Sequence, residues 1–444
     1  MSSPASDSRE ENFLENYFLH LSQFAFDRAK ELADKDKGGT ATCWGTLLQC
    51  FSQLATAEKM YMTLTFLGQK RFPGIGRARE NLRNIYQFLI QEFKRLDSSG
   101  HMDTTPGTVP PSDLEILLAH LCGQLYHYLT ARHKMMDLYE QMSAMANHKN
   151  VSFVDLSTIA SEIIEAHRRG FHHPLLSPVK SAFSLECSIL SYLLEAQVLI
   201  SEWQFLPAVL QLHQANSRLA SWAVLASVKD LPVTRAESKK GFSQSKSSTV
   251  PALYLWLLKF KGLLVSKFSL YFYDVLSKQS SSVEMKTLTA KASEDFVAKM
   301  ITFQKKSDAT SVCLVFDTTG VRDKFTGPGY HHPDKFVEPP RGVDSFPAIF
   351  SYPGDRPTNH WPNVLMRINE KDVAETGDKI SCFYDMKAHS TYFISRVDAR
   401  VSLVVIFETK KSEKDSYVNN FMSDFGSHLR CTKILSSLKP GSKT

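Results

Sequence analysis

The spacing of apolar residues changes near residue 280, and this change limits the folds that the chain can adopt. Before that point apolar side chains recur every three or four positions, as in Leu82, Ile85, Leu89, Phe93 and Leu96. Such spacing gathers them on one face of an α-helix. Comparable stripes cover about 13–32, 44–55, 114–136, 152–169, 181–200, 202–228 and 251–278. Short connections between long helices predict an antiparallel helical bundle over residues 1–280.

Local signals predict where some of these helices begin. Ser8 with Glu11 fits a capping box in front of the first stripe, and Ser112 with Glu115 fits another in front of a long helix. The most apolar stretch predicts a single helix from about 251 to 278, packed in the core of the bundle. Because this stretch also carries lysines, a helix lying on a membrane surface is the alternative.

A charged, serine-rich stretch at residues 229–250 separates the last two helical stripes. Its sequence, KDLPVTRAESKKGFSQSKSSTV, offers few apolar side chains to bury. Such a composition predicts a disordered linker within the bundle, because burial does not offset the entropy of ordering the chain.

Beyond residue 280 the sequence contains short apolar runs that are typical of β-strands. The runs SVCLVFD, FPAIFSY, KISCFYDM, STYFISRV and VSLVVIFET are rich in β-branched and aromatic residues. Helices are predicted near 287–305, near 361–371 and at the C-terminus. The order α-β-β-α-β-β-β-α predicts an α/β domain over residues 281–444 with a five-stranded, mostly antiparallel sheet. This order resembles the roadblock/longin type of domain, which implies a scaffold that regulates GTPases.

Composition and charge exclude several classes of protein. The chain has 52 Lys and Arg against 46 Asp and Glu, and this net charge of +6 is too small and too dispersed for nucleic-acid binding. Its 7 cysteines form no CxxC pair, which predicts buried single thiols in a reducing compartment. The start, MSSPASDSREEN, lacks the apolar core of a secretion signal, and charged residues interrupt the longest apolar stretch. These features predict a soluble intracellular protein.

The segment VFDTTG is an incomplete catalytic motif. An aspartic protease needs a second Asp-Thr-Gly, which the chain lacks, and a haloacid-dehalogenase motif needs an Asp where Thr319 stands. We therefore expect Asp317 and the two threonines to form hydrogen bonds with nearby amides in a loop. A hydrolase built on Asp317 is the enzymatic alternative.

Two other motifs invite a ligand-binding interpretation and are also incomplete. RFPGIGR has only part of the dinucleotide fingerprint and follows no strand, so a turn between helices is expected. The pairs His172–His173 and His331–His332 have no further ligands at the spacing of a metal site. We therefore expect no catalytic, cofactor-binding or metal-binding residues.

A long polar loop between the first two predicted strands, residues 317–345, is the candidate partner-binding segment. Loops of this length in compact domains are usually functional or disordered, and the sequence favours neither alternative. Aromatic and arginine side chains of the kind that anchor protein interfaces lie in it: Arg322, Phe325, Tyr330, Phe336 and Arg341.

Five segments together resemble the KICSTOR-subunit family. They are FLENYFLHLSQFAFDRAKEL, KRFPGIGRARENLRNIY, RRGFHHPLLSPVKSAF, LVFDTTGVRDKFTGPGYHHPDKFVEPPRG and YPGDRPTNHWPNV. The resemblance extends over essentially the whole chain and implies a non-enzymatic adaptor or scaffold subunit. It carries no catalytic or ligand-binding motif to transfer to these residues.

The resemblance also implies partners and a location. The family assembles with the large scaffold subunit SZT-two, kaptin and an integrin-FG-repeat protein on the cytoplasmic surface of lysosomes. That complex recruits the GATOR GTPase-activating complex and restrains the TOR kinase when amino acids or glucose are scarce. The alternative, prompted by the roadblock/longin-like order, is a platform or exchange factor that binds small GTPases.

Overall fold

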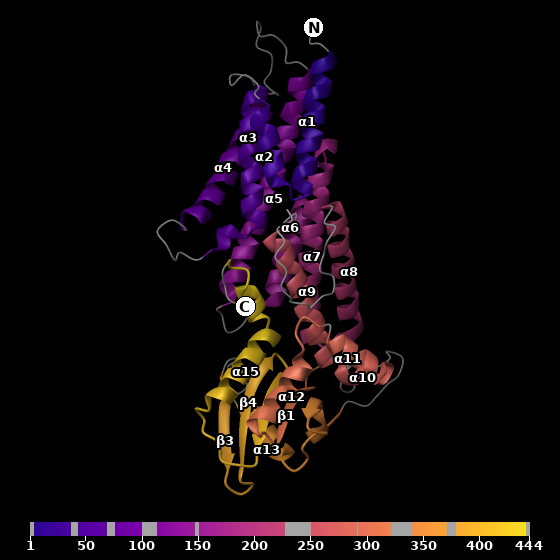
Figure 1. The fold of residues 1–444 in the computed structure, drawn as a ribbon, viewed down its shortest axis with the longest axis vertical. Helices are drawn as coiled ribbons and strands as arrows, with labels where there is room; N and C mark the ends of the chain where they lie inside the picture. Colours follow the sequence, from indigo (N-terminus) through magenta and orange to yellow (C-terminus); the bar gives the residue numbers. More distant parts are fainter. Residues whose placement is uncertain are drawn as a thin grey trace, which may run out of the picture.

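Long helices lie along the axis of the molecule, and a β-sheet closes one end (Figure 1). The computed structural model describes residues 4–36, 43–68, 76–99, 113–146, 151–226, 250–290, 292–319, 321, 340–370 and 379–440. Most of the described residues are helical, and the strands belong to one sheet in the C-terminal part. The predicted change from helices to a sheet-containing part is therefore confirmed.

The N-terminal helices are amphipathic, and their apolar stripes meet in a shared core. Helices that follow one another in the sequence pack together, above all α7 with α8 and α4 with α5. The 33 residues of α5 give it a length of about 50 Å. The helices are α1 (Pro4–Ser22), α2 (Phe26–Lys35), α3 (Cys43–Met62), α4 (Gly76–Ser99), α5 (Asp113–Met145), α6 (Phe153–His167), α7 (Ser177–Ser201), α8 (Phe205–Leu225) and α9 (Ala252–Tyr271), with the 3-10 turns η1 (Thr65–Leu67) and η2 (Pro174–Leu176).

The first predicted helix is two helices, which corrects the sequence prediction. The chain turns between α1 and α2 because Phe24 adopts a left-handed backbone conformation with φ of 60°. The Phe24 ring lies 5.6 Å from the ring of Trp222 in α8. Packing against a distant helix therefore holds a turn that the local sequence does not signal, since a left-handed conformation is unfavourable for Phe.

The two predicted capping boxes have different outcomes. Helix α1 begins at Pro4, so Ser8 lies inside the helix and the first capping box is wrong. The second prediction, Ser112 as the N-cap of α5, lies outside the described residues, which resume at Asp113.

The predicted helix at 251–278 is divided into α9 and α10 (Tyr273–Gln279). Phe272 separates them; it is buried, and its ring lies 5.3 Å from the Trp203 ring. The predicted core packing of α9 is confirmed, because most of its side chains are buried against α7, α8 and the C-terminal part. Helix α9 therefore belongs to the helical part and also joins it to the sheet.

A different helix has the length and composition of a membrane span. By these criteria alone the segment Pro174–Ser201 qualifies among the described residues, and 61% of its apolar window is buried inside the fold. Its apolar character is explained by its central place among the helices, where α1, α6, α8 and α9 all contact it.

The predicted five-stranded antiparallel sheet is confirmed. The strands lie in the order β2-β1-β5-β4-β3, and all four neighbouring pairs are antiparallel. Val312 of the central strand β1 lies opposite Tyr352 of β2 on one side and Val405 of β5 on the other. The strands are β1 (Ser311–Phe316), β2 (Ala348–Tyr352), β3 (Ser381–Asp385), β4 (Ser390–Asp398) and β5 (Val401–Phe407).

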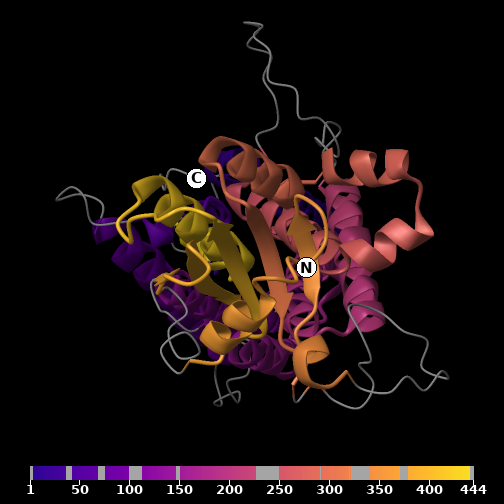
Figure 2. The ribbon, with the colours of Figure 1, turned by 90° about the horizontal axis from the view of Figure 1, so that it is seen from below.

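Both faces of the sheet are covered by helices (Figure 2). Successive residues of β5 alternate between two cores. Leu403 and Val405 join the main core with α12 (Phe296–Ser307) and α15 (Ser416–Leu429), whereas Val404 joins a smaller core with Trp361 of α13 (Trp361–Ile368). The main core also contains the helical part, so it continues without interruption across residue 280.

Two predicted helices of the C-terminal part have different bounds in the structure. The helix expected at 287–305 is replaced by α11 (Ser282–Ala290) and α12, and Asp295 caps α12 by accepting the amide of Ala298 at 2.8 Å. The expected C-terminal helix is divided into α15 and α16 (Thr432–Ser436) at Cys431, whose φ is 59°.

Candidate functional site

Most of the predicted partner-binding loop lies outside the described residues. These residues are Arg322, Phe325, Tyr330 and Phe336. Arg341 is described: it is exposed and precedes the 3-10 turn η3 (Gly342–Ser345), and its carbonyl oxygen accepts the amide of Asp344 at 3.3 Å. The role of this loop as an interface stays a prediction.

The predicted local hydrogen bonding of Asp317 is confirmed. Its Oδ1 accepts the backbone amide of Thr319 at 2.9 Å, and the Thr318 hydroxyl donates to the carbonyl oxygen of Ser345 at 2.8 Å. These bonds tie the end of β1 to the segment that leads into β2. The carboxylate of Asp317 thus shapes a turn in the structure.

The histidine pairs divide between described and undescribed residues. His173 is buried and its Nδ1 accepts the amide of Leu175 at 3.3 Å, whereas the backbone amide of exposed His172 donates to Gln124 at 2.7 Å. The pair 331–332 lies outside the described residues. Among those that are described, no three His, Cys, Asp or Glu side chains cluster as metal ligands would.

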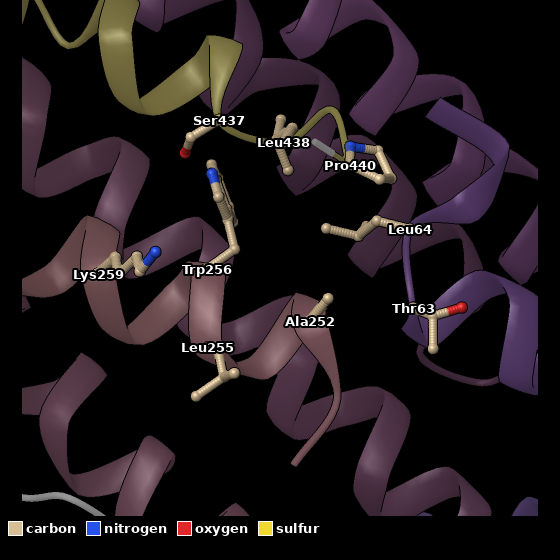
Figure 3. Close-up of a pocket in the computed structure, with 9 residues that line it drawn as sticks. All are labelled: Thr63, Leu64, Ala252, Leu255, Trp256, Lys259, Ser437, Leu438 and Pro440. Carbon is tan, nitrogen blue, oxygen red and sulfur yellow. The ribbon is translucent and has the colours of Figure 1, made fainter. Parts of the chain in front are cut away.

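A groove of about 180 Å³ lies where the C-terminal end of the chain meets the helices (Figure 3). Helix α9, the turn after α3 and the residues after α16 enclose it. The indole Nε1 of Trp256 donates to the carbonyl oxygen of Ile434 at 2.9 Å, which fixes α16 beside α9. The lining residues are Thr63, Leu64, Ala252, Leu255, Trp256, Lys259, Ser437, Leu438 and Pro440.

The chemistry of this groove suits a side chain of a partner better than a small-molecule substrate. Its lining is mostly apolar, and exposed Lys259 is its one charged side chain. Its volume is below the range of about 300–1,000 Å³ that is usual for small-molecule sites. It contains neither a nucleophile with an adjacent base nor a carboxylate pair.

A buried ion pair joins the helical part to the sheet. Lys267 of α9 is fully buried, and its Nζ lies 2.7 Å from Oδ2 of Asp398 at the end of β4. The Tyr271 hydroxyl also donates to this carboxylate at 2.7 Å. Burial alone would raise the pKa of Asp398, but the charge and hydrogen bond of Lys267 outweigh it and lower the pKa below its ordinary value.

Aromatic stacking reinforces the same junction. Trp203, at the turn between α7 and α8, stacks on Phe316 at the end of β1 with ring centroids 3.7 Å apart. On its other side it stacks on Tyr271 at 5.3 Å. Charge and packing therefore fix the sheet rigidly onto the ends of α7 and α9.

A second buried charge cluster lies inside the helical part. The guanidinium of Arg132 donates to Glu58 of α3 at 3.1 Å and to Glu186 of α7, and all three side chains are almost fully buried. Burial opposes the charge on Arg132, but the carboxylates of Glu186 and Glu58 outweigh it and raise the arginine pKa. Hydroxyl groups donate to the same carboxylates from Tyr61, Tyr86, Tyr128 and Tyr139.

Both clusters consist of groups that satisfy one another away from solvent. Neither borders the groove, and neither leaves a charged atom open to a substrate. The cysteines are equally shielded, since none of the 7 is in a disulfide and burial raises the pKa of the Cys50 and Cys313 thiols to about 12. The polar chemistry of the described residues therefore serves to hold the structure together.

The carboxylate of Glu294, between α11 and α12, carries a testable pH dependence. It lies 3.5 Å from His428 Nε2 and 2.5 Å from Lys299 Nζ, with Asp424 and Lys433 beyond the histidine. The hydrogen bond with His428, opposed by burial and assisted by Lys299, lowers the pKa of Glu294 to about 2. A lowered folded-state pKa adds stability above the unfolded pKa, and this stability is lost as the pH falls towards 2.

We expect Glu294→Gln to lower the free energy of unfolding at pH 7 by about 1 kcal/mol, because solvent screens this half-exposed group. The difference from the wild type should shrink as the pH falls from about 4.5 to 2. Urea denaturation at several pH values measures it. A deficit that is constant between pH 7 and pH 3 would contradict this assignment.

Comparison with known proteins now decides the family. Residues 3–443 match the family described as KICSTOR complex C12orf66 like. A protein named KICSTOR subunit 2 from Xenopus laevis is 41% identical over 99% of this chain and 98% of its own length. A protein of the same name from Danio rerio is 42% identical over 98% of this chain and 97% of its own length. The chain belongs to this KICSTOR family.

Membership confirms the family resemblance seen in the sequence segments. It does not locate a site, and sequence reasoning missed both buried charge clusters of this KICSTOR-family chain. A signal for them exists: Arg132 follows Leu129 by three residues on the apolar stripe of α5, and Glu58 follows Leu54 by four on that of α3. A charged residue at a core position of a helix predicts a buried partner.

Proposed function

We propose that this chain is a non-enzymatic adaptor subunit of a KICSTOR-type complex. The carrying observation is identity of 41% and 42%, over nearly the full length, with proteins named KICSTOR subunit 2. The proposal includes binding to the SZT-two scaffold, kaptin and the integrin-FG-repeat protein. It further includes peripheral attachment to lysosomes, recruitment of the GATOR complex, and restraint of the TOR kinase during amino-acid or glucose deprivation.

The structure is compatible with an adaptor in two respects. Charged groups pair with one another in the core, so the described surface offers a groove lined by apolar residues and one lysine in place of a reactive cleft. The rigid junction between helices and sheet also keeps surfaces on the two parts at a fixed distance. An adaptor needs such geometry to hold several partners in one arrangement.

The finer fold assignment belongs to the same proposal. We infer an antiparallel helical bundle over residues 1–280 and a roadblock/longin-like domain over residues 281–444. The element order β1-β2-α13-β3-β4-β5-α15 and the helices on both faces of the sheet support the second assignment. The segment at 322–341 stays the proposed partner-binding loop.

Affinity purification of the tagged chain from nutrient-starved cells tests the adaptor function. We expect the other KICSTOR subunits at equal stoichiometry and the GATOR complex with them, identified by mass spectrometry. Cells that lack the chain should keep phosphorylating TOR substrates during starvation, and re-expression should restore the arrest. Recovery of the tagged chain alone would contradict the proposal.

The roadblock/longin-like element order favours one further candidate function, a binding platform for small GTPases. It predicts binding that depends on whether the GTPase holds GDP or GTP. A panel of purified GTPases in both states, assayed with the purified chain, measures this directly. Equal or absent binding in the two states across the panel would remove this candidate without affecting the adaptor proposal.

A further inference from the structure

Helices α8 and α9 contain no acidic residue. The 21 residues of α8 carry one charge, Arg218, and the 20 residues of α9 carry three, Lys259, Lys261 and Lys267. The whole chain contains 46 Asp and Glu among 444 residues, so two consecutive helices without any are unusual. Lys267 is neutralised by Asp398 in the core, which leaves three basic residues wholly or partly at the surface.

Helix α8 exposes an apolar stripe. Leu206, Leu210 and Val224 are 50%, 54% and 80% exposed. Residues 206 and 224 are separated by five helical turns and so point in the same direction, and residue 210 lies beside them. The positions between them on this stripe, His213, Ser217 and Ser221, carry no carboxylate or permanent charge. The opposite face of α8 is buried against α7 and α9.

The stripe continues onto α9, which lies beside α8 (Figure 1). Lys261 of α9 donates to Oδ1 of Asn216 in α8 at 2.9 Å, so a cation stands at the rim of the stripe. Val265, 37% exposed, lies one turn further along α9. We define the α8–α9 face as Leu206, Leu210, Val224, Lys261 and Val265.

We propose that the α8–α9 face binds an acidic amphipathic helix from another subunit of the complex. The inference rests on the proposed adaptor function and specifies its partner chemistry. Exposed apolar side chains at helical spacing match the apolar stripe of a second helix laid along α8. Carboxylates flanking that stripe complement Lys261 on this face and Lys259 on the next turn of α9, where no acidic residue of α8 or α9 competes.

Two other occupants fit the same face less well. A second copy of this chain would bring Lys261 near its own counterpart in a two-fold interface, with no carboxylate on either face to offset it. An anionic membrane is recognised by clusters of about four to eight basic residues. The α8–α9 face carries one lysine, with Lys259 nearby.

Variants of exposed residues test the proposal with the purified remaining KICSTOR subunits as the probe. We expect the double variant Leu206→Glu and Leu210→Glu to weaken binding at least about tenfold, because it places charge in the apolar contact. Val154→Glu on α6 is the matched control, since Val154 is 56% exposed, and it should bind as the wild type does. Thermal melting of each variant checks that the fold is intact.

The charge component has its own test. Lys261→Gln keeps a donor for Asn216 but removes the cation, so binding should weaken several-fold at low salt and become less dependent on salt. Lys305→Glu on α12, at another exposed lysine, is the control and should change neither. Equal salt dependence in Lys261→Gln and the wild type would remove the electrostatic part of the proposal.

Cross-linking identifies the occupant. A photoreactive residue at position 210, in the assembled complex, should label an acidic helical segment of a different subunit. Labelling of a second copy, or binding only to vesicles with anionic lipids, would overturn the inference. A complex that forms normally with the double variant would also overturn it and leave the adaptor function standing. Failure of the wild type to assemble would instead contradict the adaptor function itself.

Discussion

Replacing Arg132 by Met is expected to lower the free energy of unfolding by about 3–5 kcal/mol. The substitution roughly preserves volume but leaves the carboxylates of Glu58 and Glu186 buried without a cation. Tyrosine hydroxyls still donate to both carboxylates, yet hydrogen bonds from neutral groups do not offset two buried negative charges. Denaturation in urea, followed by circular dichroism, measures the change.

Two comparisons make this prediction specific. Arg95→Met removes an exposed ion pair with Glu92 and should change stability by less than about 1 kcal/mol. Adding Glu58→Gln and Glu186→Gln to Arg132→Met should recover part of the loss, because no buried charge then remains. If Arg132→Met and Arg95→Met proved equally stable, the buried cluster would not have the role assigned to it.

Replacing Lys267 by Met is expected to cost about 3 kcal/mol and to loosen the junction between the helices and the sheet. Asp398 would lose its cation and keep the neutral donor Tyr271. Hydrogen exchange should increase in β4 and at the end of α9, since the ion pair links these two elements. The control Lys278→Met removes an exposed pair with Asp274 and should be nearly neutral.

The pH dependence of the Lys267 variant should have the opposite sign to that of the wild type. In the wild type the folded-state pKa of Asp398 is lowered, so its contribution is present above the unfolded pKa of about 4 and is lost on acidification. In the variant, burial without Lys267 raises that pKa, so acidification should reduce the deficit. Denaturation at pH 7 and pH 4 distinguishes the two cases, and a deficit that grew at pH 4 would contradict the assignment.

Local periodicity was sufficient to predict most elements of this fold. The stripe from Leu82 to Leu96 became α4, and the run SVCLVFD became β1, because each pattern exposes one consistent face to a core. The antiparallel sheet also followed from the order of short apolar runs. The same reasoning predicted the loop bonds of Asp317, since Asp and Thr at the end of a strand commonly bond nearby amides.

Helix breaks were not predictable, because packing between distant segments sets them. Phe24 and Cys431 adopt left-handed conformations that are ordinarily unfavourable for these residue types. Phe24 is held by the ring of Trp222, and the Cys431 thiol lies 3.4 Å from Oε1 of Gln197. Neither neighbour is near in sequence, so no local pattern signals the turns.

The sequence by itself determined the kinds of elements, their order and the family, because periodicity and distinctive segments are local properties of the chain. The tertiary structure alone decided which charges face one another. Arg132 meets Glu186 across 54 residues, and Ser201 reaches Asp398 across 197. It also left the apolar stripe of α8 at the surface, because α7 and α9 already occupy the other face of that helix.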